Sequence, residues 1–199
     1  MKRIEQLLSW LTVLFYPIAI YYWVTWSKIY RWFHNSAYAG INIRNDLTPQ
    51  DAQRLMDTLP WEADSWEQLW DVAGNPEKFQ RDLSVKLLTG ILATGPRDCD
   101  DFAGWAAVAV DKSYKPKIMA TWYKVPGVLF PRGHVVCYVE INGDGYHIGN
   151  WGMRGPVINS YQAVAYTVAG EKDADLLAFA ILDKNLKVES VERVRWPMG

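Results

Sequence analysis

The sequence predicts an α+β fold in which helices come first and an antiparallel sheet follows. Helix-start signals recur through the first 110 residues, at Thr48-Pro49, at Asn75-Pro76 and at Asp98. After residue 116 apolar and polar residues alternate with a period of two, which is typical of half-buried strands. Asn142-Gly143 lies between two such segments and is a strong hairpin signal, so neighbouring strands are expected to run antiparallel.

Composition excludes some classes of protein. The 199 residues suffice for one ordinary domain and a short extra element, and half of them are hydrophobic, which supports a packed core. The 21 basic and 22 acidic side chains give a net charge of -1, so nothing indicates a nucleic-acid surface. Two cysteines, Cys99 and Cys137, cannot form a scaffold of several disulfides.

Residues 6–27 form an uncharged stretch of 22 residues, long enough to cross a bilayer, with Tyr and Trp gathered at one end. A signal peptide has a shorter apolar region, and the nearest A-x-A, at 37–39, lies too far downstream. A helix in the membrane plane would need a charged face, which is missing. A helix buried against other subunits also fits, because polar residues and Pro17 dilute the hydrophobicity.

We therefore expect residues 1–34 to form an apolar helix that anchors the protein to a membrane or to a larger assembly, such as a virion. Residues 35–199 are expected to form the folded domain, with 28–46 as a connector. Helices are predicted within 47–60, 64–70, 75–88 and 99–110, and strands at 117–125, 134–141, 146–152, 163–168, 176–182 and 188–196.

The segment GPRDCDDFAGWAAV, residues 95–108, places Cys99 in the first turn of a helix that Asp98 can cap. The positive end of the helix dipole favours the thiolate of Cys99. The neighbouring charges of Asp98, Asp100 and Asp101 oppose it. A reactive cysteine here would therefore need a cationic partner from elsewhere, usually a histidine that a third polar group orients.

His134 is the best candidate for that histidine, because it opens the strand 134–141. Alternation places Cys137 on the opposite face of that strand, as a buried thiol, which argues against a disulfide with Cys99. The hairpin returns Asn150 toward His134, so its amide oxygen is a candidate to orient the imidazole, with Trp151 shielding the bond. His147 is expected to point the other way from Asn150 and to take no part.

Simpler interpretations compete with this one. A cysteine near a helix start is more often just buried, and a histidine at a strand start is more often a surface or capping residue. A metal site is disfavoured because Cys99, Cys137, His134 and His147 lack the usual ligand spacing. We predict no metal and no cofactor.

The segment GPRDCDDFAGWAAVAVD resembles the nucleophile segment of the transglutaminase-like cysteine peptidases, the bacterial branch of the papain-like superfamily. The upstream WEQLWDVAGNPEKFQRDL is similar to that branch, His134 in GHVVCYVE matches its histidine, and Asn150 in YHIGNWG falls where it has Asp or Asn. The resemblance spans about residues 60–155. Two departures are Pro96-Arg97, which separate Gly95 from the acidic-Cys core, and Asn at a position where transglutaminases proper have Asp.

The resemblance implies a papain/transglutaminase-like fold with helices packed on an antiparallel sheet. It implies a thiol protease with a Cys99, His134 and Asn150 triad that cleaves a peptide or amide bond of a peptide or protein substrate through an acyl-thioester. An amine in place of water would instead give cross-linking. The backbone N–H of Cys99 is one oxyanion donor, and Trp70 and Arg97 are weak candidates for the second. A catalytically silent assembly protein that retains the fold remains an alternative.

Overall fold

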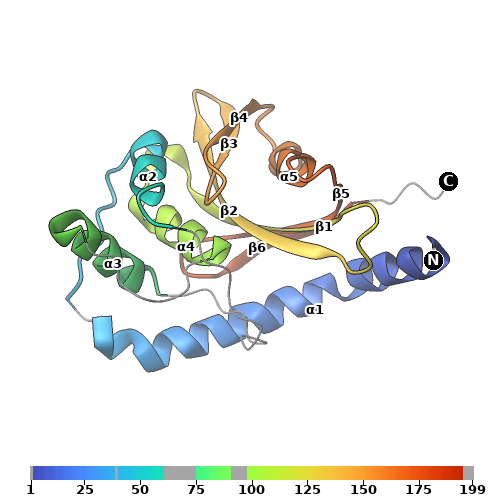
Figure 1. The fold of residues 1–199 in the computed structure, drawn as a ribbon, viewed down its shortest axis with the longest axis horizontal. Coiled ribbons are helices and arrows are strands. Elements are labelled where there is room, and N and C mark those ends of the chain that lie inside the picture. The colour runs from blue at the N-terminus through green and yellow to red at the C-terminus, as the bar shows by residue number, and fades with distance from the viewer. Residues whose placement is uncertain (1, 39, 61–74, 91–97, 195–199) are drawn as a thin grey trace.

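The computed structural model describes residues 2–38, 40–60, 75–90 and 98–194, and it shows an α+β fold (Figure 1). A long apolar helix at the N-terminus is followed by shorter helices and a six-stranded antiparallel sheet. The α+β class and the antiparallel sheet predicted from the sequence are confirmed at this level.

The helices are α1 (Lys2–His34), α2 (Pro49–Met56), α3 (Pro76–Thr89), α4 (Cys99–Ala109) and α5 (Tyr161–Gly170), with short 3-10 turns η1 (Asn35–Tyr38) and η2 (Lys112–Tyr114). The strands are β1 (Lys117–Lys124), β2 (Arg132–Ile141), β3 (Asp144–Ile148), β4 (Arg154–Val157), β5 (Asp175–Leu182) and β6 (Val188–Arg193). In the sheet the strands lie in the order β4-β3-β2-β1-β5-β6.

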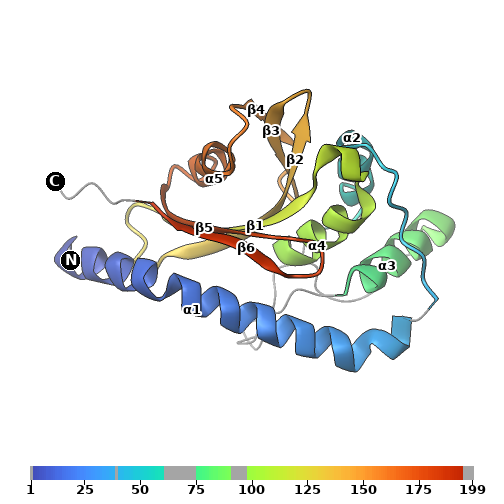
Figure 2. The same ribbon diagram turned by 180° about the vertical axis from the view of Figure 1, so that it is seen from behind.

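The sheet divides the molecule into layers, with α5 on one face and α1 and α4 on the other (Figures 1 and 2). Side chains alternate along each strand, so each face has its own core. Ile118 and Cys137 pack in the core that includes α1 and α4, whereas Met119 and Val136 pack with α5. The small residues of α4, among them Ala103 and Ala106, are fully buried and allow this helix to approach the sheet closely.

The predicted helix starts are confirmed where the chain is described. The side chain of Thr48 accepts a hydrogen bond from Asp51 N at 3.1 Å, Asn75 caps α3 by accepting from Glu77 N, and Asp98 caps α4 by accepting from Asp100 N. The hairpin turn is also confirmed, with φ of 54° at Asn142 and 88° at Gly143, the left-handed conformation that a tight antiparallel turn requires. The helix predicted within 64–70 lies outside the described residues.

Three sequence-based assignments are wrong. The segment 163–168, predicted as a strand, lies in α5, because Ser160 caps a helix and its apolar residues also fit a helical face. Residues 28–34, predicted as a connector, form the last turns of α1. The strand predicted to run to residue 152 ends at Ile148, and β4 follows although Gly155-Pro156 reads as a strand breaker.

Helix α1 lies along the sheet and is fixed to it by its central residues. The hydroxyl of Tyr16 donates a buried hydrogen bond of 2.7 Å to Ala120 O, and its ring packs edge-on against Trp122. Near the same turn, Arg193 donates to Leu14 O at 3.2 Å. The side of α1 that faces the sheet is therefore held by polar contacts as well as by apolar packing.

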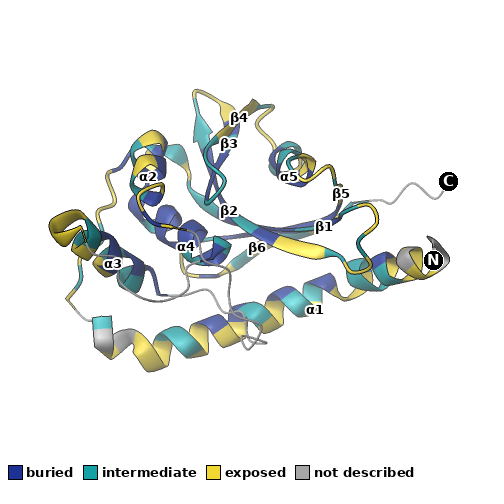
Figure 3. Ribbon diagram, in the orientation of Figure 1, coloured by how far each residue is buried: buried dark blue, intermediate teal, exposed yellow. Residues whose placement is uncertain are grey.

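The other side of α1 exposes large apolar side chains, and Figure 3 shows exposed residues in yellow along this helix. They include Trp10, Phe15, Ile18, Tyr21, Trp26 and Trp32. Among the described residues, one segment, Gln6–His34, has the length and apolar composition of a membrane span, and 22% of its most apolar window is buried. A signal sequence or a core helix would meet the same criteria, so this finding alone is weak evidence for a membrane.

The substitution Tyr16→Phe tests whether α1 rests on the sheet. It removes the buried hydrogen bond to Ala120 O and should lower the free energy of unfolding by about 1 kcal/mol, measured by urea denaturation. Tyr21→Phe, on the exposed side of the same helix, is the matched control and should change nothing measurable. Equal stabilities of the two variants would show that α1 does not dock on the sheet.

Candidate active site

Cys99 is the first residue of α4; its side chain is half-buried and forms no disulfide. Asp98 precedes it as the N-cap, in an extended conformation, and the helix then runs into the core through Phe102 and Ala106. The thiol therefore stands where the backbone enters a helix, at the positive end of its dipole. This is the position that the sequence predicted for Cys99.

His134 lies near the start of β2 and is buried, with 4% of its surface exposed. Thr121 of β1 is its cross-strand partner, and the Thr121 hydroxyl donates to the backbone oxygen of His134 at 2.9 Å. Nε2 of His134 is buried and has no hydrogen-bond partner among the described residues. The amide of Asn150, predicted to orient the imidazole, therefore makes no hydrogen bond to this nitrogen.

The sheet opens beside His134. Strand β3 pairs with β2 only from the pair Cys137–Ile148 to the turn, so residues 132–136 of β2 pair within the described sheet with β1 alone. The body of α4 lies on the opposite face, against Cys137 and its neighbours. The unpaired edge of β2 is thus where the start of α4 can approach the imidazole.

The charges of Asp98 and Cys99, at the start of α4, act on the pKa values of two side chains at this edge. The charge of Asp98 acts on His134, in the direction that raises the pKa of His134. Burial raises the pKa of Tyr123, and the charge of Cys99 raises it further. Because Tyr123 lies two residues beyond Thr121 on β1, it is a diagonal neighbour of His134 on the same face of the sheet. The N-cap and the first residue of α4 therefore act on two neighbouring side chains of the β1–β2 ladder.

Asn150 lies in the turn after β3, not on a strand as predicted. This turn is held from outside the sheet by Gln53 of α2, which donates to Gly149 O at 2.9 Å and accepts from Gly149 N at 3.1 Å. Gln53 thus bonds to both backbone polar groups of Gly149, whose oxygen also accepts from Gly152 N at 3.1 Å. The β2–β3 ladder does not continue through that residue, and the position of the turn is fixed.

Trp151, which was expected to shield a bond between Asn150 and His134, covers the ring of His134 itself. The two rings stack with centroids 3.6 Å apart and planes inclined by 12°. Lys172, which follows α5, places its ammonium group over the Trp151 ring, with Nζ 3.7 Å from the centroid of that ring. The imidazole is therefore held in orientation by an aromatic surface rather than by a hydrogen bond to Nε2.

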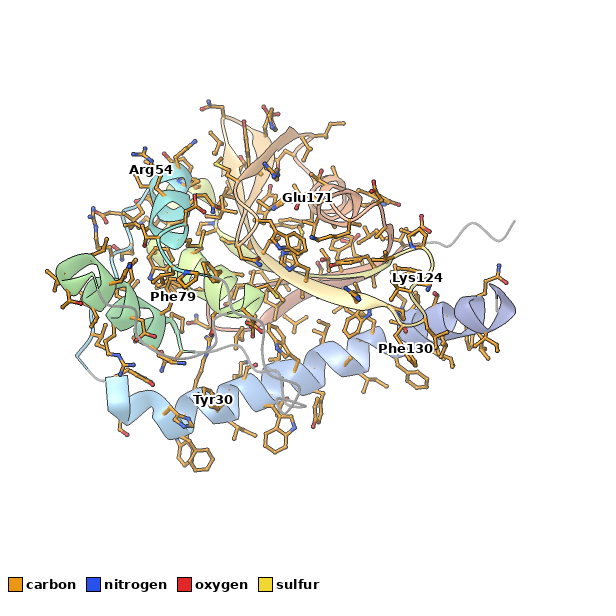
Figure 4. All side chains as sticks on the ribbon, in the orientation of Figure 1. Tyr30, Arg54, Phe79, Lys124, Phe130 and Glu171 are labelled. Carbon is orange, nitrogen blue, oxygen red and sulfur yellow. The ribbon has the colours of Figure 1, made fainter. Side chains whose placement is uncertain are left out.

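His147 corrects the prediction for this histidine. It pairs with Tyr138 across the strands, which puts it on the same face as His134, not away from the site. It is 2% exposed, and its Nε2 lies 3.2 Å from Oε1 of Glu171 at the end of α5. Arg154 Nε lies 3.4 Å from the same oxygen. In Figure 4 the labelled Glu171 lies beside α5, on the side of the sheet that this helix covers.

These surroundings keep the imidazole of His134 neutral. Burial lowers its pKa to about 3, and the charges of His147 and Lys172 act in the same direction, while Asp98 opposes them. A neutral imidazole can accept a proton from a thiol, as a general base does. It does not form a standing ion pair with Cys99 at neutral pH.

Cys137 behaves as a buried core thiol, on the opposite face from His134 as predicted. It has no exposed surface, and burial raises the pKa of its thiol. Neither cysteine forms a disulfide. In the described part of the chain no group of three or more His, Cys, Asp and Glu side chains could hold a metal ion. The suggested oxyanion donors Trp70 and Arg97 lie outside the described residues.

Sequence reasoning missed His147, Glu171, Lys172 and Gln53. The position of His147 could be predicted from the register of the hairpin, because a two-residue turn at Asn142-Gly143 sets Tyr138 opposite His147. Extended past Ile148, the same register sets Trp151 opposite His134, in agreement with the observed stack. Glu171 and Lys172 could not be found this way, because they depend on α5, which was assigned as a strand.

No protein-family model matches this sequence, and no curated protein matches it either.

The depressed pKa of His134 predicts a specific loss of stability in acid. A histidine that titrates near 6.5 when unfolded and at about 3 when folded binds its proton mainly in the unfolded state. Stability should therefore fall as the pH falls below about 6.5, by about 2 kcal/mol at pH 5 from this residue alone. Urea denaturation at pH 7 and pH 5 measures it, with His134→Gln as the reference that lacks this contribution. Parallel pH dependence in both proteins would contradict the assignment.

Proposed function

We propose that this chain is a cysteine hydrolase of transglutaminase-like type that cleaves a peptide or amide bond of a peptide or protein substrate. Cys99 is the nucleophile, His134 the general base and then acid, and Asn150 the candidate group that orients the imidazole in the working state. The support for the proposal is that Asp98 and Cys99, at the start of α4, act electrostatically on His134 and Tyr123, beside the unpaired edge of β2.

The chemistry follows from this arrangement. The imidazole of His134 takes the proton of the Cys99 thiol as Sγ forms a bond to the scissile carbonyl carbon. The backbone N–H of Cys99, at the helix start, is one donor to the oxygen that gains negative charge. When the C–N bond breaks, His134 returns the proton to the leaving amine, and an acyl-thioester remains on Cys99.

Water completes the cycle. His134, again neutral, takes a proton from a water molecule that attacks the thioester carbonyl, and Cys99 leaves as the thiol with that proton. An amine in place of water gives the cross-linking reaction with the same residues. The low pKa of His134 fits a base that is free at neutral pH, and the stack on Trp151 keeps its ring in one orientation.

The chain is proposed to act while associated with a membrane or with a larger assembly through α1. The support is the row of large apolar side chains that α1 exposes on the side turned away from the sheet. Because Tyr16 and neighbouring residues hold the opposite side, the docked helix would lie along a surface rather than cross it.

A second candidate function is a structural protein that retains the fold without the reaction. The observation that favours it is the site at rest, where the neutral His134 provides no imidazolium to stabilise a thiolate on Cys99. The two candidates differ in whether Cys99 reacts faster than an ordinary exposed thiol and whether His134 is needed for that.

Thiol labelling separates these candidates. With iodoacetamide at pH 7.5, Cys99 should be alkylated and Cys137 should stay unmodified, because Cys137 is completely buried. The substitution His134→Gln should slow alkylation of Cys99, and His34→Gln, an exposed histidine of α1, should not. Mass spectrometry of the labelled peptides gives both rates. If Cys99 is alkylated at the same rate in the wild type and in His134→Gln, the structural protein is favoured.

Acyl transfer tests the reaction itself. Incubation with p-nitrophenyl acetate should release nitrophenol in a burst and leave an acetyl group on Cys99, which hydroxylamine removes. We expect Cys99→Ala to abolish the burst and His134→Gln to slow turnover by at least about a hundredfold, the usual contribution of a general base. Added amines that capture the acetyl group would point to cross-linking, and slow release to water would point to hydrolysis. Acylation at Cys137 or at lysines instead would count against the proposed nucleophile.

A further inference from the structure

Two consecutive residues at the end of α5 contact the segment that joins β3 to β4. Oε1 of Glu171 lies 3.2 Å from Nε2 of His147, near the end of β3, and 3.4 Å from Nε of Arg154, the first residue of β4. The next residue, Lys172, places Nζ 3.7 Å from the ring centroid of Trp151, which lies between these two strands. The end of α5 therefore contacts this connection at both of its ends and in its middle.

The backbone at this end of α5 is fixed by hydrogen bonds. Glu171 N donates to Thr167 O at 3.1 Å. Lys172 N and Ala174 N both donate to Ala169 O, at 3.0 and 3.2 Å. Ala169 itself is buried in the core between α5 and the sheet. These bonds use the carbonyl groups that a helix end would otherwise leave unpaired, so the start of the Lys172 side chain has a defined position.

Glu171 fixes the same helix end to the sheet. Its side chain is 16% exposed, and Arg154, which lies at its carboxylate, carries a permanent positive charge. His147 and Arg154 are partners across β3 and β4, so one carboxylate contacts both strands. Lys172 follows directly and is itself exposed, so its side chain reaches Trp151 from a helix end that Glu171 already holds.

The ammonium, indole and imidazole groups form a stack. The ring of His134 lies on one face of Trp151, with centroids 3.6 Å apart and planes inclined by 12°. Nζ of Lys172 lies at almost the same distance from the Trp151 centroid, and both groups cannot occupy one face at these distances. The indole therefore lies between Lys172 and His134. A cation is attracted to the negative face of an indole, and here it also blocks movement of the indole away from the imidazole.

We propose that Lys172 is a positioning residue for His134: its ammonium, held in place by the end of α5, keeps the indole of Trp151 against the imidazole. This inference deepens the proposed function, and its catalytic meaning rests on His134 as the general base. The stack itself can be measured without turnover. Helix α5, which contributes no reacting atom, then controls the orientation of the base.

The test is the rate at which diethyl pyrocarbonate modifies each histidine of the full chain at pH 7, followed by mass spectrometry. The chain has three histidines, which serve as references for one another. His34 is exposed and should react fast, whereas His134 and His147 are 4% and 2% exposed and should be protected. Because His134 reacts only when its cover opens, its rate reports how often Trp151 leaves the imidazole.

The substitution Lys172→Met keeps the length of the side chain and removes its charge. Since a cation on a partly exposed aromatic ring changes an equilibrium severalfold, His134 should be modified about threefold faster. His34 and His147 should keep their wild-type rates. Lys172→Arg retains a cation on the indole and should restore protection of His134. Lys184→Met, which removes an exposed lysine between β5 and β6, is the matched control and should match the wild type.

Equal rates for His134 in Lys172→Met and in the wild type would overturn the proposal. If His134 and His147 both become more reactive, Lys172→Arg decides: restored protection supports the proposal, and continued loss overturns it. The indole must also be the intermediary. In a Trp151→Leu background, Lys172→Met should leave the rate of His134 unchanged, and an equal acceleration in both backgrounds would show that Lys172 does not act through Trp151.

Failure of this proposal and failure of the proposed function are distinguishable, because modification of His134 requires no catalysis. If Cys99→Ala abolishes acylation by p-nitrophenyl acetate while Lys172→Met leaves His134 protected, Cys99 is the nucleophile but Lys172 does not position the base. If protection of His134 depends on Lys172 but no acyl-enzyme forms, the positioning contact exists and the hydrolase proposal fails.

Discussion

Two hydrogen bonds between the side chain of Gln53 and the backbone of Gly149 hold the turn that follows β3, where the pairing of β3 with β2 has ended, and the candidate site depends on that turn. Beyond this point β2 has an open edge, and His134 lies on it. The turn that Gln53 holds carries Trp151 onto the imidazole. A ladder that continued for two more pairs would close the edge by which α4 approaches. One amide side chain from α2 thus organises a site to which it contributes no reactive atom.

Much of the fold was predictable, because it is encoded locally. Thr48, Asn75 and Asp98 each cap a helix where a polar side chain precedes an apolar period, and the Asn142-Gly143 turn needs the left-handed backbone that these residues tolerate. The strand predicted at 163–168 was wrong because a six-residue, mostly apolar run fits the period of a helix as well as that of a strand. Only the cap at residue 160 distinguishes the helix.

The site was predictable only in part. The placement of Cys99 at a helix start and of His134 and Cys137 on opposite faces of a strand follows from short-range periodicity. The error over His147 came from following alternation without the register, which the turn already determines. The contacts of Glu171, Lys172 and Gln53 join segments far apart in sequence, so no local pattern could reveal them.

The central claim is that the sulfur of Cys99 and the imidazole of His134 come together. The most direct measurement is cross-linking with 1,3-dichloroacetone, whose two reactive carbons can join a thiol only to a group a few ångströms away. The account predicts that peptide mapping finds Cys99 joined to His134 and that the folded protein loses acylation. Alkylation of Cys99 without a cross-link, or with a cross-link to another residue, would contradict it.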